Sequence, residues 1–360
     1  MLYSYFIITT KSVSFGVGNI TVNLFLFFLL FLIIFNAKEI IDKNKLTTVL
    51  FLVDIMLLFL SNLSNNSGFG SIASVITFLL ILQISSYIKI NKKTMLLLLI
   101  IDLLFWMYSL TIDYEFYNIN TNNAASSVFY LCVIIINLMW IIINNKFYRK
   151  IGILFIIIIT LLNIIKYDCR NIMLVLSLLL LLVLFDLTKF FKKSNTLKRN
   201  LFWFIITIGS LIMTIIYIFL YKNNYYLNLS FISTKSFYSG RESIWLNLYD
   251  IFKKHIVFGI GSKSIYFPRQ GAHNYMLSVL TLFGLPHFIV FISNIYSYVS
   301  NLFSNKINNK NYLCLMSIMC LFFTEFFEAS FIDGSKLYTL FILSVLFFSV
   351  IIKERDDEYE

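Results

Sequence analysis

Apolar runs of about 15 to 22 residues, separated by short polar segments, follow one another along most of the chain. A helix that crosses a bilayer needs about 20 predominantly apolar residues. The pattern therefore predicts eleven membrane-spanning helices, at 20–35, 46–62, 71–88, 94–112, 126–143, 151–165, 171–188, 201–221, 274–295, 312–330 and 337–352.

The first 19 residues are also apolar but are interrupted by Lys11, Gly16 and Gly18. We expect a clipped or re-entrant helix there, which would be a twelfth span if it crosses. A cleaved signal peptide is not expected, because no basic residue precedes the apolar run.

The composition excludes two broad classes of protein. Of the 360 residues, 59% are hydrophobic and 13% are charged, and the mean hydropathy is +0.83. Soluble domains carry about 25% charged residues and about 45–50% apolar ones. A single soluble core cannot bury this much apolar surface, and a disordered chain is far more polar. We therefore predict an all-α, polytopic helix bundle that forms one integral membrane domain over residues 1–360.

The net charge of +11 reflects topology and not nucleic-acid binding. Alternate loops and the C-terminus carry 18 Lys and Arg residues, whereas the other short loops and ends carry four. Basic loops stay in the cytoplasm. The C-terminus is therefore predicted to be cytoplasmic, and a long loop over residues 222–272 is predicted to lie on the outer side.

This long loop contains a predicted amphipathic helix. Ser239 and Glu242 have the spacing of a capping box, and the helix should run to about Lys254. Its apolar positions fall on one face, so it could lie on the outer bilayer surface. The apolar positions are Ile244, Trp245, Leu248, Ile251 and Phe252.

Two arginines and one histidine are the candidate reactive groups at the outer face. Arg241 stands in the first turn of the loop helix, where an anionic ligand would offset its conflict with the helix dipole. The alternative is a surface ion pair with Glu242 or Asp250. His273 opens the ninth span and could transfer a proton near neutral pH, or else hydrogen-bond a loop carbonyl. Arg170 opens the seventh span and could instead extend to lipid headgroups.

Several carboxylates fall inside predicted spans. Glu325 and Glu328 are at i and i+3 of the tenth span, so they are expected on one helical face, toward a cavity or paired with an arginine. Asp54 and Asp102 lie mid-span and are expected to be hydrogen-bonded within the bundle.

Metal and disulfide chemistry find little support in the sequence. The four cysteines, Cys132, Cys169, Cys314 and Cys320, have no metal-binding spacing, and only Cys169 lies at the edge of an apolar run. The three histidines, His255, His273 and His287, form no paired motif. We predict no metal, no cofactor and no disulfide framework.

Three motifs, taken in their order along the chain, resemble the O-antigen ligase and Wzy-type polysaccharide polymerase family. They are the string Gly240-Arg241-Glu242-Ser243-Ile244-Trp245, the turn Phe258-Gly259-Ile260-Gly261, and the pair His273-Asn274 followed by Gly284. Arg170 also resembles the family's Ser/Thr-Arg start of an earlier helix, with Cys169 in place of the hydroxyl residue.

The resemblance implies a C-type, metal-independent, inverting glycosyltransferase. It would act on undecaprenyl-diphosphate-linked oligosaccharide at the outer face of the bacterial cytoplasmic membrane. Arg241 and Arg170 would bind the diphosphate, and His273 would be the general base. The further expected substrate contacts are Trp245, Asn274, Gly259, Gly261, Glu325 and Glu328.

Three functions stay open on the sequence. The first is a polymerase that joins lipid-linked repeat units of an O-antigen or capsule. The second is a ligase of the same family, and the third is a flippase for the same lipid-linked sugar, although no repeated halves are visible. The expected partners are the lipid-linked oligosaccharide and membrane lipids, with a chain-length regulator and a flippase as candidates, and no nucleic acid.

Overall fold

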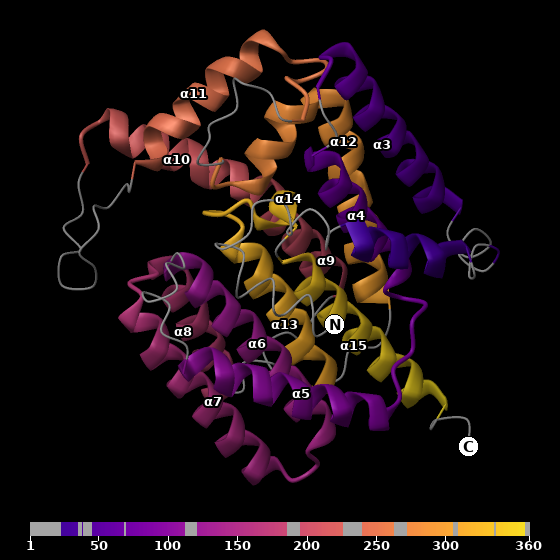
Figure 1. The fold of residues 1–360 in the computed structure, drawn as a ribbon, viewed down its shortest axis with the longest axis vertical. Helices are drawn as coiled ribbons and strands as arrows, with labels where there is room; N and C mark the ends of the chain where they lie inside the picture. The colour runs from indigo at the N-terminus through magenta and orange to yellow at the C-terminus, as the bar shows by residue number, and fades with distance from the viewer. Residues whose placement is uncertain are drawn as a thin grey trace.

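The computed structural model of the chain describes residues 23–34, 38, 45–67, 70–111, 121–185, 195–225, 240–262, 272–304, 309–334 and 336–356. Across these residues the fold is all-helical, with no strand, as the sequence predicts (Figure 1). Residues 1–19 and Ser239 lie outside the described residues.

The helices follow the apolar pattern closely. A helix at Asn23–Ile34 is followed by α3 (Lys45–Ser64), α4 (Gly70–Ile84), α5 (Lys92–Thr111), α6 (Thr121–Ile142), α7 (Lys146–Lys166), α8 (Arg170–Leu184), α9 (Asn195–Phe204), a π-helical turn (Ile205–Gly209), α10 (Ser210–Lys222), α11 (Arg241–Lys254), α12 (Tyr275–Ser304), α13 (Asn309–Thr324), α14 (Ser330–Asp333) and α15 (Leu337–Asp356).

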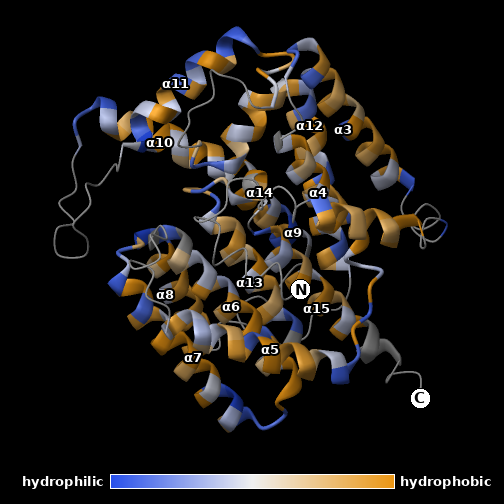
Figure 2. Cartoon of the chain, viewed as in Figure 1, coloured by the Kyte–Doolittle hydropathy of each residue, from blue (hydrophilic) through white to orange (hydrophobic). Residues whose placement is uncertain are grey.

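Six of the described helices are long and apolar enough to cross a membrane: Lys45–Ser64, Lys92–Thr111, Ala124–Ile142, Lys146–Lys166, Thr196–Lys222 and Tyr275–Ser304. Five shorter apolar helices coincide with the remaining predicted segments. Many large apolar side chains are exposed on the outside of the bundle, and others fill its core, as a lipid environment requires. Hydrophobic residues predominate along the helices (Figure 2). The chain thus has the helices of a multi-pass membrane protein, while the count of eleven spans and the orientation stay predictions.

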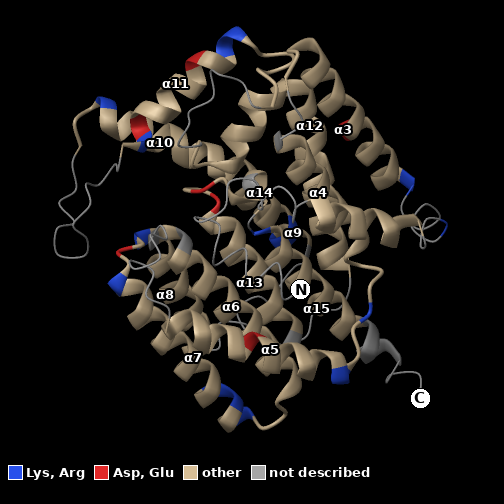
Figure 3. Ribbon diagram, in the orientation of Figure 1, with Lys and Arg blue, Asp and Glu red and all other residues tan. Residues whose placement is uncertain are grey.

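The helices form two regions joined by α13 and α15. Helices α5 to α8 pack on one another in sequence order at one end, and α3, α10 and α11 lie at the other end (Figure 1). Helix α12 packs most extensively on α3, and α13 packs on α15 near the middle. The connection between α13 and α14 therefore lies between the two regions, and it carries an acidic stretch (Figure 3).

Helix α11 ends at Lys254, as predicted, but two expectations about it need correction. Its N-cap is Gly240, in the left-handed conformation with φ 77° and without a side-chain cap hydrogen bond, so Arg241 is the first helical residue. Its apolar face does not lie on lipid, because Trp245 and Leu248 are fully buried against α10 and α12.

Helix α12 is broken at Gly284, which has a non-helical φ of 82°. The loop after α11 closes the break with three backbone hydrogen bonds: Ile260 N–H to Thr281 O, Gly261 N–H to Leu282 O, and Leu285 N–H to Ile256 O. Polar backbone groups freed by the break are thereby satisfied within the protein, which a membrane helix requires.

Candidate functional site

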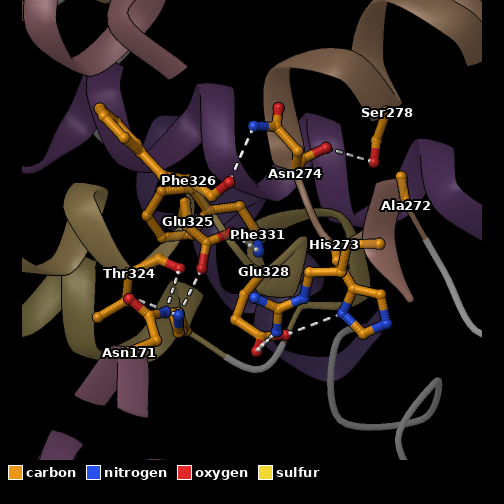
Figure 4. A network of polar contacts seen from close by, with 12 residues as sticks. Asn171, Ala272, His273, Asn274, Ser278, Thr324, Glu325, Phe326, Glu328 and Phe331 are labelled. Atoms are coloured by element: carbon orange, nitrogen blue, oxygen red, sulfur yellow. Dashed lines mark hydrogen bonds and ion pairs between the residues drawn. The ribbon is translucent and has the colours of Figure 1, made fainter. Parts of the chain in front are cut away.

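Arg241, His273 and Glu328 meet at the end of the bundle formed by α11 and the start of α12. The Arg241 Nη2 lies 3.3 Å from Glu328 Oε1, and the His273 Nδ1 lies 3.5 Å from Glu328 Oε2 (Figure 4). Their side chains are 19%, 29% and 24% exposed, so the three groups are half-buried and open to solvent. The second ring nitrogen of His273 points away from Glu328 (Figure 4). The structure thus unites two of the three predicted catalytic residues.

His273 has a backbone conformation that marks it out. Its φ is 48°, and the other non-glycine residues with positive φ among those described are two asparagines and an aspartate. A left-handed conformation costs an L-residue about 1–2 kcal/mol, so its surroundings must hold it.

The residues on both sides of His273 are fixed by side-chain hydrogen bonds. Trp245 Nε1–H donates to Ala272 O at 2.7 Å, and its ring packs 5.1 Å from that of Tyr217. On the other side, Asn274 is fully buried. These contacts hold the imidazole at the start of α12.

Asn274 is the N-cap of α12. Its Oδ1 accepts from Leu277 N–H at 2.9 Å, and its Nδ2 donates to Ser210 Oγ at 2.9 Å. The Nδ2 also donates to Phe326 O at 3.0 Å (Figure 4). The structure therefore assigns Asn274 and Trp245 positioning contacts. Their expected direct contact with substrate stays a prediction, although both side chains are buried.

Glu325 and Glu328 do not share a helical face, contrary to the sequence expectation. Helix α13 ends at Thr324, so both carboxylates lie on the connection to α14. Glu328 joins Arg241 and His273, which bears out the alternative of pairing with an arginine. Glu325 is fully buried and pairs instead with Lys336, at 2.6 Å between Oε1 and Nζ.

Lys336 was missed by sequence reasoning. It lies just before α15 and is 1% exposed, and its Nζ also donates to Thr324 Oγ1 at 2.6 Å. The apolar residues that follow it were the available signal, but its partner Glu325 is not evident from the sequence. The nearby carboxylates raise the pKa of the Lys336 ammonium despite its burial.

The electrostatics keep Glu328 ionised. Burial pulls the pKa of Glu328 upward, but the hydrogen bond from His273 and the charges of Arg241 and Lys336 outweigh it, so the pKa lies below its usual value. Burial also raises the pKa of Glu325, against the pull of Lys336.

Arg170 is the first residue of α8 and is half-buried. Its neighbour Asn171 donates from Nδ2 to Thr324 O at 2.9 Å (Figure 4). The start of α8 therefore lies against the end of α13, four residues before Glu328 in the chain. Arg170 therefore begins a helix whose next residue contacts the end of α13, while its contact with a ligand stays a prediction.

Gly259 and Gly261 serve backbone packing. Both have positive φ, and a Cβ on Gly259 would lie 2.4 Å from the carbonyl carbon of Leu282. A Cβ on Gly261 would overlap Ser67. Only glycine allows this loop to approach the break in α12 so closely. This close packing accounts for glycine at both positions without the predicted contact with substrate.

A second polar group lies between α3 and α12. Asp54 Oδ2 accepts from Asn294 Nδ2 at 2.7 Å, and Asp54 Oδ1 lies 2.5 Å from His287 Nδ1. Asp54 and His287 are 0% and 1% exposed. Asp54 is thus hydrogen-bonded in the bundle, as expected. His287 is the partner in that buried pair. Its position within an apolar run gave no sign of this contact. Asp102 is also buried.

The site has the parts of an acid–base and anion-binding centre: an imidazole beside a carboxylate, and a guanidinium on that carboxylate's other oxygen. Among the described residues, no group of three or more His, Cys, Asp or Glu side chains is arranged to hold a metal ion. All four cysteines are buried free thiols.

Comparison with protein-family models, curated proteins and solved structures finds no match to this chain.

Proposed function

We propose that this protein is a membrane-embedded glycosyltransferase that polymerises lipid-linked oligosaccharide repeat units. The observation that carries the proposal is the convergence of His273 and Arg241 on Glu328 at one end of an apolar helix bundle. The resemblance of the surrounding motifs to the O-antigen ligase and Wzy-type polymerase family supplies the substrate class, a sugar chain carried on undecaprenyl diphosphate.

In the proposed reaction, an acceptor sugar hydroxyl attacks the anomeric carbon of the donor chain. The bond from that carbon to the diphosphate breaks, and undecaprenyl diphosphate leaves. His273 takes the hydroxyl proton, and Arg241 stabilises the charge that grows on the departing phosphate. One displacement inverts the anomeric carbon.

Arg241 has donors available for this role. One guanidinium nitrogen contacts Glu328, and a guanidinium carries five N–H groups in a planar fork that suits phosphate oxygens. Arg170 is proposed as the second cation, because the start of α8 lies against the connection that carries Glu328. Glu325 is proposed to support this connection from the buried side and not to touch substrate.

The proposal places the protein in the cytoplasmic membrane of a bacterium, with the C-terminus in the cytoplasm and the site at the outer face. A reporter that is active only outside should work when fused after Tyr238 or Lys263 and fail after Lys193 or Asn309. Activity after Lys193 would contradict the orientation.

The direct test uses purified protein in vesicles that contain undecaprenyl-diphosphate-linked oligosaccharide. Product chains are resolved by length. His273→Ala should lower the rate by about 10²–10⁴-fold, which is the usual contribution of a general base. Arg241→Lys should also lose most activity, because a point charge does not replace the bidentate fork.

His255→Ala is the matched control, since His255 is an exposed residue at the C-cap of α11. A near-normal rate in His273→Ala would refute the mechanism. So would activity that is lost on chelation and restored by a divalent cation. Transfer of the polymer to another acceptor would identify a ligase, and net movement of the lipid-linked sugar without coupling would identify a flippase.

A further inference from the structure

Glu328 links three separate parts of the fold through one carboxylate. It lies on the connection between α13 and α14, and its two oxygens contact Arg241 of α11 and His273 at the start of α12 (Figure 4). Each oxygen faces one partner, at 3.3 Å and 3.5 Å. The arrangement resembles neither a lone surface pair nor a free carboxylate poised to act as a base.

Hydrogen bonds of the neighbouring residues restrain this contact. The side-chain Nδ2 of Asn274 donates to Phe326 O at 3.0 Å, and the backbone N–H of Tyr275 donates to Glu325 O at 3.3 Å. These two bonds tie the start of α12 to the connection that carries Glu328. His273 and Glu328 are therefore held near each other by one side-chain and one main-chain hydrogen bond between neighbouring residues.

We propose that Glu328 is a positioning residue that orients the His273 imidazole, an inference that rests on the proposed role of His273. In this arrangement, Nδ1–H is donated to Glu328, so the lone pair of the neutral ring is on Nε2, the nitrogen that points away. The carboxylate also stabilises the imidazolium that forms when Nε2 takes a proton.

The charges that face Glu328 suit this role. Arg241 approaches from α11, Lys336 acts on Glu328 from the start of α15, and Glu325 is the opposing acid on the same connection. The two cations keep Glu328 ionised, so it remains an acceptor for the ring. Arg241 in turn is held where its remaining donors can meet an anion.

The chain offers a direct readout of the ring that needs no sugar substrate. It contains three histidines: His273 at the site, the exposed His255 and the buried His287. Diethyl pyrocarbonate modifies the unprotonated imidazole, and mass spectrometry gives the rate at each histidine separately. The purified full-length protein in lipid vesicles is treated at pH 6 and at pH 8.

Glu328→Gln removes the negative charge and keeps the size of the side chain. At pH 6 it should raise the modification rate of His273 about three- to fivefold, because the carboxylate no longer favours the protonated ring. At pH 8, where an ordinary imidazole has lost its proton, the rate should be unchanged. His255 should be modified at the same rate in both proteins at both pH values. The control variant Asp250→Asn, which alters an exposed carboxylate of α11, should leave the modification rate of His273 unchanged.

Glu328→Asp provides the conservative variant and should keep a pH ratio closer to that of the unaltered protein. An unchanged ratio at His273 in Glu328→Gln would refute the proposal. An equal rise at pH 6 and pH 8 would also refute it, since that result means only that the ring has become more accessible.

The polymerisation assay adds a second, separate arm. Glu328→Gln should lower kcat at least tenfold while the KM for the lipid-linked donor changes by less than about threefold. A higher KM with an unchanged kcat would mean that Glu328 serves only the anion site, against the proposal. If the modification result holds but no protein polymerises the donor, the positioning contact stands and the proposed function fails.

Discussion

The buried pair of Glu325 and Lys336 allows a quantitative test of the fold beside the site. Both side chains are at most 1% exposed, and their charged atoms are 2.6 Å apart. Lys336→Met removes the cation and leaves Glu325 with the N–H of Phe331, at 3.0 Å, as its remaining hydrogen-bond donor. Glu325 must then stay charged without a counter-ion or take up a proton.

Loss of one partner of a buried pair costs about 3–5 kcal/mol of unfolding free energy. At roughly 2–4 °C per kcal/mol, the thermal midpoint of Lys336→Met should fall by about 6–20 °C. The double variant Glu325→Gln/Lys336→Met removes both charges of this pair and keeps an acceptor for Phe331. It should recover all but about 1–2 kcal/mol, because neutral replacements of a buried pair are well tolerated.

Thermal unfolding in detergent, followed by tryptophan fluorescence, measures all three proteins. The loss in Lys336→Met should also shrink below about pH 5, since a protonated Glu325 no longer needs a cation. Lys253→Met is the matched control, because its pair with Asp250 spans 3.9 Å and both side chains are more than half exposed. A double variant as unstable as Lys336→Met would refute the reasoning.

Three further predictions test other contacts. Because the pKa of Glu328 is lowered in the folded chain, its ion pairs stabilise the fold at pH values above the usual Glu pKa of about 4.3. This stabilisation is lost as the pH falls through the lowered folded pKa. The thermal midpoint of Glu328→Gln should therefore fall less on acidification than that of the unaltered protein. His287→Leu leaves buried Asp54 without its imidazole, so folded protein in membranes, measured by size-exclusion fluorescence, should drop severely, and a normal yield would exclude the contact. Gly259→Ala should lower the thermal midpoint of the protein more than Gly240→Ala does. Both glycines have positive φ, but a Cβ at Gly259 would meet main chain, whereas nothing lies within 4 Å of a Cβ at Gly240.

The helices were predictable because a bilayer imposes one dominant pattern. Every predicted apolar segment coincides with a described helix, since backbone groups in lipid must be satisfied within the segment. The break in α12 was not predicted, because hydropathy does not register the conformation of Gly284. The nearby Pro286 was the available signal, since proline removes a helical hydrogen bond.

The site was predictable only in part, because its contacts join distant segments. Arg241 and His273 stood out as reactive side chains where helices begin. Glu328 was predicted to lie in a helix, because Phe326 and Phe327 extend the apolar run beyond the end of α13 at Thr324. No local pattern pairs Glu325 with Lys336, or Asp54 with a histidine 233 positions away.

The closed break in α12 has a consequence for how the site works. Three main-chain hydrogen bonds join the loop after α11 to both sides of Gly284, and Trp245 of α11 holds Ala272 beside His273. The guanidinium and the imidazole therefore belong to one preorganised block of the protein, and bringing them together requires little rearrangement at the moment of reaction. Any movement that admits a bulky lipid-linked chain should shift this block as a unit, with slow hydrogen exchange at Ile260, Gly261 and Leu285 as its signature.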